Sequence, residues 1–511
     1  MASEFSWRIY AVCLFAAFGG LCFGYDTGVL SSILTMEDFI YTMKQRDYLT
    51  PLEQGTLTGL LLAGCFVGAL IAGQTAELIS RKRTIILAAV VFIIGAALQT
   101  GANGYAMMVT GRAIAGLGIG GLSMIVPVYQ SELAPKEIRG RLISLQQFMI
   151  TVGLMISFWA GAGTNINQTG QATWRIPLGI QIAPAIILFI GAFFLPYSPR
   201  WLVSKGRNDE ALQVLAKLHA NGDVNSPFVQ QEYREIVEQI SQERAVAITN
   251  YLELFKGNTR RRLILGILIQ VFQQFTGINS IMYYAPQIFK QAGIGEQSAT
   301  LIASGVNGVL NMLATIPAIL FMDKLGRRKT LISGAIFMGI AMLLCGIVMG
   351  ATGRVFFDEA EGKHNVDMSG NSHASYFCIV MIYFFVAGFA YSWGPVGWIY
   401  PAEIYTLNVR AKASSMSTAA NWLMNFVISQ IVPVMLADIT WGTYIFFGCC
   451  CLFMSGIVFI FFPETKGKSL EEMDAVFGGS VFAFRDIKNA RNLEISTDAT
   501  EKVGSIASEK V

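Results

Sequence analysis

Long apolar segments dominate this chain of 511 residues and limit what it can fold into. An α-helix rises about 1.5 Å per residue, so about 20 apolar residues cross a hydrocarbon core about 30 Å thick. Charged residues make up 14% of the chain, whereas soluble globular domains contain about 25%. The sequence therefore predicts an all-α polytopic membrane protein with twelve transmembrane helices. The predicted spans are roughly 8–30, 55–79, 84–102, 106–131, 142–163, 177–195, 263–289, 298–322, 329–350, 375–402, 411–437 and 441–462.

The positions of basic residues predict how these spans are oriented. Clusters such as 81–83 and 260–262 lie in every second connection, whereas 103–105 has no basic residue and 161–176 has only one. Lysine and arginine accumulate in cytoplasmic loops, so both termini are expected to be cytoplasmic. The N-glycosylation sequon that starts at Asn167 then lies outside.

The longest polar connection divides the spans into six and six. Within it, 209–219 and 230–244 have the pattern of amphipathic surface helices. We therefore expect two six-helix bundles with a cytoplasmic helical linker between them. The expected domains are a first bundle over 1–195, the linker over 196–262, a second bundle over 263–462 and a disordered cytoplasmic tail over 463–511.

The two halves of the chain carry matching motifs. The segment 77–84 after the second span resembles 323–330 after the eighth. Likewise, Tyr129, Glu132 and Arg139 recur at one constant offset, as Tyr400, Glu403 and Arg410. A duplicated six-span unit with a site between its halves is typical of alternating-access transport.

An unusual polar stretch, Gln273 to Asn279, lies inside the seventh span, and Gln270 shares a helix face with its two glutamines. Amides are costly in hydrocarbon unless they have a partner or a ligand. Amide groups followed by Tyr283 and Tyr284 suit an uncharged polyhydroxyl ligand at mid-membrane. The alternative is that such amides join helix to helix, and it stays open for Gln270 and Asn425.

Two ionisable residues lie deep in the predicted membrane segments. Asp26 is about 15 Å, and Arg112 about 13 Å, from the same membrane side. A lone charge there costs about 3 kcal/mol or more, so pairing is expected. The pair can serve proton coupling, in which a helix shift loads and releases a proton on Asp26, or it can be a permanent structural ion pair.

Other classes of function are disfavoured. A net charge of +3 is too small to argue for nucleic-acid binding, and the three histidines lie in separate polar loops, which disfavours a metal site. The eight cysteines lie in or beside apolar segments, as buried hydrophobic residues do. Because no nucleophile–base pair or phosphate loop stands out, we expect no enzyme activity and no cofactor.

From Gly24 to about Glu472 the chain resembles the sugar porters of the major facilitator superfamily. The resemblance rests on the two repeated basic loops and on four further motifs. It is weakened where Glu77, Ser80 and Tyr197 replace the aspartate, glycine and glutamate usual in the family, which puts one cytoplasmic latch contact in doubt. The four motifs are 196–202, 273–279, 394–398 and 463–467.

The resemblance implies the major facilitator fold and a set of functional residues. Sugar contacts are implied for Gln147, Gln273, Gln274, Asn279, Asn311, Trp393 and Asn421, and gating or pocket-lining roles for Tyr283, Tyr284, Trp398 and Trp422. Proton coupling is implied for Asp26 and Arg112. A cytoplasmic salt-bridge latch between the bundles is implied for Glu77, Arg81, Glu132, Arg139, Asp323, Arg327, Arg328, Glu403 and Arg410.

The leading hypothesis is a plasma-membrane transporter, functional as a monomer, that takes up a monosaccharide such as glucose by alternating access coupled to proton symport. One alternative is a facilitative carrier without coupling. Another, from a different class, is a sugar sensor that does not transport, although the tail is short for a sensor. The sequence leaves open which sugar or polyol is bound and whether Asn167 is glycosylated.

Overall fold

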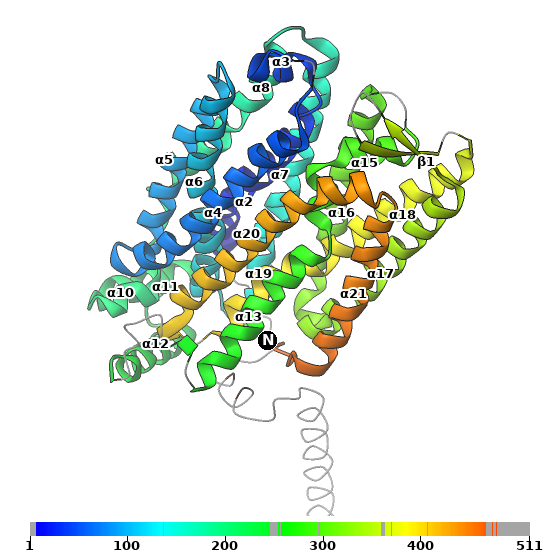
Figure 1. Ribbon diagram of the computed structural model, residues 1–511. Coiled ribbons are helices and arrows are strands. Elements are labelled where there is room, and N and C mark those ends of the chain that lie inside the picture. Colours follow the sequence, from blue (N-terminus) through cyan, green and yellow to red (C-terminus); the bar gives the residue numbers. More distant parts are fainter. Residues whose placement is uncertain are drawn as a thin grey trace, which may run out of the picture.

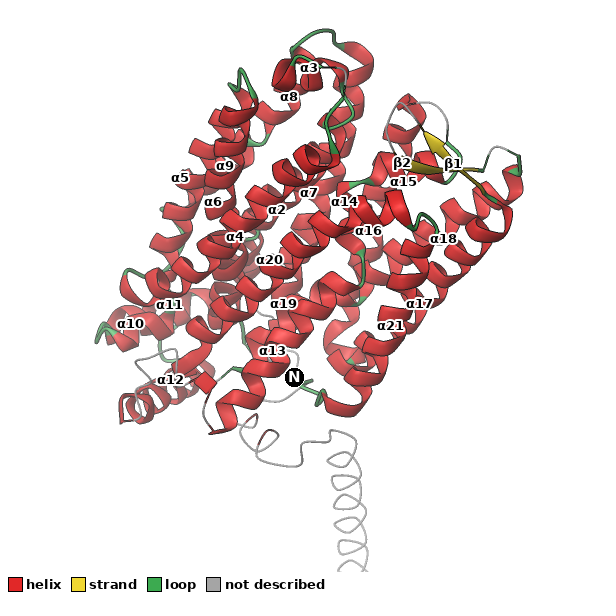
Figure 2. Ribbon diagram, in the orientation of Figure 1, coloured by secondary structure: helices red, strands yellow, loops and turns green. Residues whose placement is uncertain are grey.

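The computed structural model consists of two groups of long helices that stand side by side (Figure 1). The short helices within residues 199–245 lie at one end of the long helices, and a two-stranded hairpin lies at the other (Figure 2). We call these the linker end and the hairpin end. The structure describes residues 7–46, 48–135, 137–245, 254–255, 257–294, 297–358, 363–368, 370–405, 407–466, 473 and 477.

The expectation of an all-α polytopic membrane protein is confirmed. Within the described residues, eleven helices are long and apolar enough to cross a membrane. Many of their large apolar side chains, such as Ile187, Ile347 and Phe453, are exposed on the outside. Lipid tails solvate such surfaces, and a helix satisfies its own backbone hydrogen bonds there.

The first six spans comprise helices α1 to α9. In the first and sixth spans the assigned helix is interrupted at one residue, Ala17 and Gln181, although the backbone angles of both residues stay in the helical region. A short helix, α3, which the sequence analysis did not predict, follows the first span at the hairpin end (Figure 2). The helices are α1 (Trp7–Ala16), α2 (Phe18–Ile33), α3 (Glu37–Lys44), α4 (Pro51–Leu78), α5 (Arg81–Thr100), α6 (Tyr105–Leu133), α7 (Arg139–Asn167), α8 (Ala172–Ile180) and α9 (Ile182–Ala192).

The second six spans comprise helices α13 to α21. The tenth span bends at Ser392, and an unpredicted hairpin, β1 (Arg354–Asp358) with β2 (Lys363–Asp367), connects the ninth and tenth spans. The helices are α13 (Gly257–Phe275), α14 (Ile278–Tyr283), α15 (Ala285–Gln291), α16 (Gln297–Leu325), α17 (Arg327–Thr352), α18 (Ser372–Tyr391), α19 (Trp393–Ile404), α20 (Leu407–Asp438) and α21 (Gly442–Phe461).

The seventh predicted span is divided at Gly277 into α13 and α14, and it is not among the eleven candidate spans. The backbone φ of Gly277 is 88°, in the left-handed region that favours glycine. A Cβ at this position would lie 2.6 Å from the Phe447 ring. The break therefore needs glycine both for its backbone angle and for the close approach of α21.

The linker forms three helices, α10 (Pro199–Ser204), α11 (Asn208–His219) and α12 (Pro227–Ala245). The last two cover the stretches expected to be helical, whereas α10 was not expected. Their apolar faces pack on one another around Trp201, Leu215 and Ile236. Of the tail, the structure describes 463–466, 473 and 477, so the expected disorder concerns residues that lie mainly outside the described part.

The two groups of helices meet along α4 with α20 and along α7 with α16. At the hairpin end of this seam, Gln430 Nε2 donates to the Gly55 carbonyl at 2.5 Å. At the linker end, the Arg141 backbone N–H donates to Asp323 Oδ2 at 3.2 Å. The seam is therefore closed by contacts on both sides of the molecular centre.

Candidate functional site

A pocket lies at the centre of the seam, and helices from both halves line it. Most of its polar side chains are amides, and its apolar side chains come from α2, α7, α14, α18 and α19. The lining residues are Phe23, Thr27, Gln147, Ile150, Leu154, Gln273, Gln274, Ile278, Asn279, Met282, Asn311, Phe389, Trp398 and Asn421.

One hydrogen bond in the pocket joins the two halves directly. Trp398 Nε1 on α19 donates to Gln147 Oε1 on α7 at 3.1 Å. This bond orients the Gln147 amide. It also holds the edge of the indole beside the pocket, where its face can pack on C–H groups.

The seventh span supplies an amide network that the break at Gly277 makes possible. Asn279 on α14 donates through Nδ2 to Gln274 Oε1 on α13 at 2.6 Å, across the break. On the preceding turn, Gln273 Nε2 donates to the Trp393 carbonyl at 2.9 Å, and Gln273 Oε1 accepts from Asn421 Nδ2 at 2.8 Å. These contacts hold the amides in place with some donors and acceptors directed at the pocket.

Asn311 on α16 carries the clearest unfilled hydrogen-bonding capacity. Its side chain is buried and lines the pocket, but its Oδ1 atom has no hydrogen-bond partner within the described residues. Buried amide oxygens are normally satisfied. A hydroxyl group in the pocket would satisfy this one.

Gln270 and Asn425, for which a purely structural role stayed open, make contacts between helices. Gln270 Nε2 donates to the Gly397 carbonyl at 2.8 Å, and its Oε1 accepts from Asn421. Asn425 Nδ2 donates to the Tyr283 hydroxyl at 3.1 Å. Neither residue belongs to the pocket lining.

Four predicted site residues lie outside the pocket lining, since their polar groups are bonded elsewhere. Trp393 Nε1 donates to the Leu331 carbonyl at 2.9 Å, so Trp393 offers the pocket only its backbone carbonyl, which Gln273 uses. We therefore correct its assignment as a side-chain sugar contact. The other three are hydrogen-bonded to neighbouring helices: the Tyr283 hydroxyl accepts from Asn425 Nδ2 at 3.1 Å, Tyr284 donates to the Ser429 carbonyl at 3.1 Å, and Trp422 donates to Ser123 at 3.0 Å.

The sequence analysis missed the apolar part of the lining. Ile150 and Leu154 lie one and two helical turns after Gln147, so helical spacing from Gln147 could have identified them. Phe23 and Phe389 had no such signal, because an aromatic residue in an apolar span looks the same whether it faces a pocket, a helix or lipid.

Asp26 and Arg112 form an ion pair between α2 and α6. Arg112 Nη1 lies 2.8 Å from Asp26 Oδ2 and 3.0 Å from Oδ1, and both side chains are completely buried. Arg112 Nε donates to the Leu57 carbonyl at 3.1 Å, whereas its Nη2 has no partner in the part of the chain described. The structure thus brings together the two deep charges, as their depths predicted.

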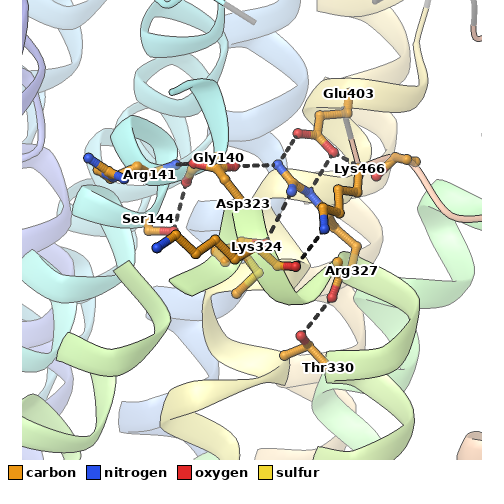
Figure 3. Close-up of polar contacts among 12 residues, drawn as sticks. Gly140, Arg141, Ser144, Asp323, Lys324, Arg327, Thr330, Glu403 and Lys466 are labelled. Atoms are coloured by element: carbon orange, nitrogen blue, oxygen red, sulfur yellow. Dashed lines mark hydrogen bonds and ion pairs between the residues drawn. The ribbon is translucent and has the colours of Figure 1, made fainter. Parts of the chain in front are cut away.

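The predicted latch of the second half centres on Arg327 (Figure 3). Its guanidinium contacts Glu403 at 2.6 and 3.0 Å and Asp323 at 3.0 Å. All three residues belong to the second half. Asp323 then reaches across the seam and accepts a hydrogen bond from the Arg141 backbone N–H.

The first half has the corresponding arrangement. Arg81 pairs with Glu132 at 2.8 Å, and Ser198 Oγ donates to the same carboxylate at 2.5 Å. Across the seam, Lys412 Nζ lies 3.4 Å from Glu77.

The salt-bridge latch between the bundles stays a prediction. The ion pairs of Arg81 and Arg327 described above lie within each half, whereas Asp323 and Glu77 reach Arg141 and Lys412 across the seam, two residues outside the predicted set. Arg410 of the second half also interacts electrostatically with Glu132 of the first half. Three predicted arginines donate to backbone carbonyls as well: Arg139 to Ala134 at 3.5 Å, Arg410 to Tyr405 at 3.1 Å, and Arg328 to Phe459.

Tyr197 replaces the carboxylate usual in this motif. Its ring lies 5.0 Å from Lys82 Nζ and 5.2 Å from the Arg207 guanidinium carbon, and it stacks on Trp201. Cations are attracted to the face of an aromatic ring. The ring therefore keeps basic residues close at a position where a carboxylate would form a salt bridge.

Comparisons with known proteins agree with this geometry. The family model for sugar (and other) transporters matches residues 12–477. The chain is 40% identical over 499 residues to the MFS glucose transporter mfs1 of Aspergillus flavus, a match that covers 96% of this chain and 93% of the relative.

Solved structures of the xylose transporter XylE have a similar backbone. The proton:xylose symporter XylE bound to 6-bromo-6-deoxy-D-glucose has a TM-score of 0.78 at 29% identity, over 92% of this chain and 99% of that chain. For the inward-open conformation of XylE from E. coli, the TM-score is 0.67 at 28% identity, over 92% and 99% of the two chains. The present backbone is thus closer to the ligand-bound structure than to the inward-open one.

Proposed function

This chain belongs to the sugar transporter family of the major facilitator superfamily, and we propose that it takes up a monosaccharide, a hexose such as glucose, by alternating access. The family is one of multi-pass membrane transporters and not of enzymes. The observation that supports a sugar as the substrate is the central pocket. Amides from both halves line it, together with Asn311, whose Oδ1 atom has no hydrogen-bond partner among the described residues.

The chemistry of the pocket suits one sugar ring. Gln147 and Asn421 lie in opposite halves, so a ring that bonds both would tie the halves together. An amide offers a donor and an acceptor to neighbouring hydroxyls, while Trp398 and Phe389 can cover the C–H faces of the ring. The A. flavus relative, a glucose transporter by name, supports a hexose.

We further propose that transport is coupled to proton symport through Asp26. Its carboxylate is completely buried and is held by Arg112, which keeps one N–H group without a partner among the described residues. A shift of α2 against α6 would lengthen this pair and change how readily Asp26 holds a proton. The structural similarity to a proton:xylose symporter supports the proposal.

The orientation and the domain division belong to the same proposal. Helices α5 and α17 begin at the linker end with Arg81 and Arg327, and the positive-inside rule then directs this end, with both termini, to the cytoplasm. The proposed units are the bundles 1–195 and 263–462, the linker 196–262 and the tail 463–511. We propose that the protein works as a monomer in the plasma membrane.

Uptake of radiolabelled glucose by transporter-deficient yeast cells tests the substrate. Cells that produce the protein should accumulate glucose above vector controls, and Asn311→Ala should raise the KM about ten-fold, the expected loss for one or two hydrogen bonds. Competition by epimers and deoxy sugars identifies the hydroxyls that matter. Absence of uptake for every monosaccharide, with the protein present at the cell surface, would favour a sensor.

The coupling needs a separate measurement in proteoliposomes. Sugar added outside should drive proton entry and acidify the lumen, and Asp26→Asn should abolish this signal while sugar exchange at equilibrium continues. If wild-type uptake is indifferent to external pH and to membrane potential, the protein is a facilitative carrier.

A further inference from the structure

A buried histidine connects the linker to the first half of the molecule. His219 is the last residue of α11, and its side chain is 1% exposed. Its Nδ1 atom lies 2.7 Å from Glu232 Oε2 on α12. Its Nε2 atom lies 3.0 Å from the carbonyl oxygen of Leu133, the last residue of α6. One imidazole ring therefore contacts three helices.

Both partners of the ring are hydrogen-bond acceptors. A neutral imidazole has one N–H group and can donate to only one of them, whereas the imidazolium donates to both. We propose that His219, when protonated, clamps α11 and α12 onto the end of α6, and that loss of the proton releases the linker. The device acts at the linker end, which we propose faces the cytoplasm.

The clamp is placed where the linker meets the transport machinery. Leu133 follows Glu132, which pairs with Arg81 at the start of α5 and accepts from Ser198 just before α10. The linker is thus held to the first half by two adjacent polar anchors, Ser198 on Glu132 and His219 on Leu133. Deprotonation leaves His219 with one N–H group, which the Glu232 carboxylate accepts as the stronger acceptor. The anchor on Leu133 is then lost, and the anchor of Ser198 on Glu132 remains.

The surroundings of His219 favour its charged form. Burial opposes protonation of His219. This effect is outweighed by the hydrogen bond and charge of Glu232, together with the Leu133 carbonyl and the charge of Glu137. The pKa of His219 is therefore raised above its ordinary value of about 6.5. The Phe228 ring lies 6.0 Å away. The charged groups on the surrounding elements are Glu232 on α12, Glu137 between α6 and α7, Glu132 on α6 with its partner Arg81 on α5, Lys217 on α11 itself and Arg8 on α1.

The direction of the pH effect follows from the raised pKa. A group that is more basic in the docked state than in the free state stabilises docking at low pH, and this contribution is lost as pH rises through the docked-state pKa. The clamp is therefore closed in mildly acidic solution and opens as the pH rises through the pKa of docked His219. The proposal does not require proton symport, because the residues of the clamp are separate from Asp26 and from the pocket.

Hydrogen–deuterium exchange of the full-length protein in nanodiscs tests the clamp between pH 6 and pH 9, after correction for the intrinsic exchange rate. In the wild type, protection of the amides of α11 and α12 should fall about ten-fold along a one-proton curve, the loss expected when one hydrogen bond from a charged group is removed. His219→Gln should give protection that is independent of pH. The control is His364→Gln, at an exposed position of β2 at the hairpin end. Its amide protection should depend on pH as it does in the wild type.

Glu232→Gln provides a second, milder variant. It keeps an oxygen acceptor for Nδ1 but removes the negative charge, so the midpoint of the curve should move to lower pH. The proposal is overturned if wild-type protection is flat over this range or if His219→Gln keeps the wild-type curve. Should His219→Gln fail to fold, an unchanged midpoint in Glu232→Gln overturns it instead.

Discussion

The linker end of the seam should be opened by adding one methyl group at Gly140. A Cβ at this position would lie 2.3 Å from Asp323 Oδ1 and 2.3 Å from Arg327 Nη2, whereas ordinary contacts begin at 3.4 Å. The two side chains cannot simply turn away, because Arg327 is bonded to Glu403 and Asp323 to the Arg141 backbone N–H (Figure 3). Gly140→Ala must therefore separate α7 from α16 or break a bond that crosses the seam.

The size of the effect follows from the bond at risk. A hydrogen bond to a charged group contributes about 1.5–3 kcal/mol, and the lower figure corresponds to about a ten-fold change in an equilibrium constant. The contact between Asp323 and the Arg141 N–H exists only while this end is closed, so its loss should favour the open form about ten-fold.

A buried reporter on the same helix can measure this change. Ser144 is buried one turn after Gly140 and donates to its carbonyl at 2.8 Å. In a Ser144→Cys background, a membrane-impermeant maleimide added at the linker end should react about ten-fold faster when Gly140→Ala is also present. The parent chain without the reporter gives the background from the native cysteines.

The same helix offers a matched control. Gly163 also lies on α7, and a Cβ there would meet nothing within 4 Å. Gly163→Ala should therefore leave maleimide labelling and sugar uptake unchanged. If Gly140→Ala behaves like Gly163→Ala in both assays, the contact between Asp323 and α7 does not control closure of this end.

Two further predictions concern the pocket and the buried ion pair. Trp398→Phe removes the donor to Gln147 Oε1 and should raise the KM for sugar about five-fold, which corresponds to about 1 kcal/mol. Trp393→Phe removes a hydrogen bond to Leu331 and should lower the melting temperature without changing the KM. A raised KM for Trp393→Phe would contradict its placement outside the pocket. Arg112→Ala leaves the Asp26 carboxylate buried and unpaired, which costs about 3–5 kcal/mol. The melting temperature of Arg112→Ala in detergent should therefore be far below that of the double variant Asp26→Asn/Arg112→Gln. Equal melting temperatures would show that pairing of the Asp26 carboxylate adds nothing to stability.

Several structural features followed from local sequence alone. The length of the apolar segments predicts membrane helices, because the bilayer thickness sets the number of residues needed, and the amphipathic pattern of 209–219 predicts the helix observed as α11. The depths of Asp26 and Arg112 predicted their pairing, because axial rise per residue is a local property.

Other features depend on which helix faces which neighbour. Trp393 directly precedes the motif 394–398, which ends with Trp398. The indole of Trp393 nevertheless faces α17 and that of Trp398 faces the pocket, because the two residues lie at different angles around α19. The sequence likewise places an acidic residue, Glu77 or Asp323, at the start of each of the two matching segments. Only the packing of the two halves shows that Asp323 reaches a backbone N–H group across the seam.

The chain by itself thus determined its class, its count of spans and its family, because hydrophobic length and short motifs are read along one dimension. Tertiary structure decided which amides are filled by other helices and which, like Asn311, keep an atom unpartnered in the pocket. It also decided that His219 lies between two acceptors, Glu232 and Leu133, from different helices. Hydrogen-bond partners of this kind are far apart in sequence, and only the packed helices bring them within bonding distance.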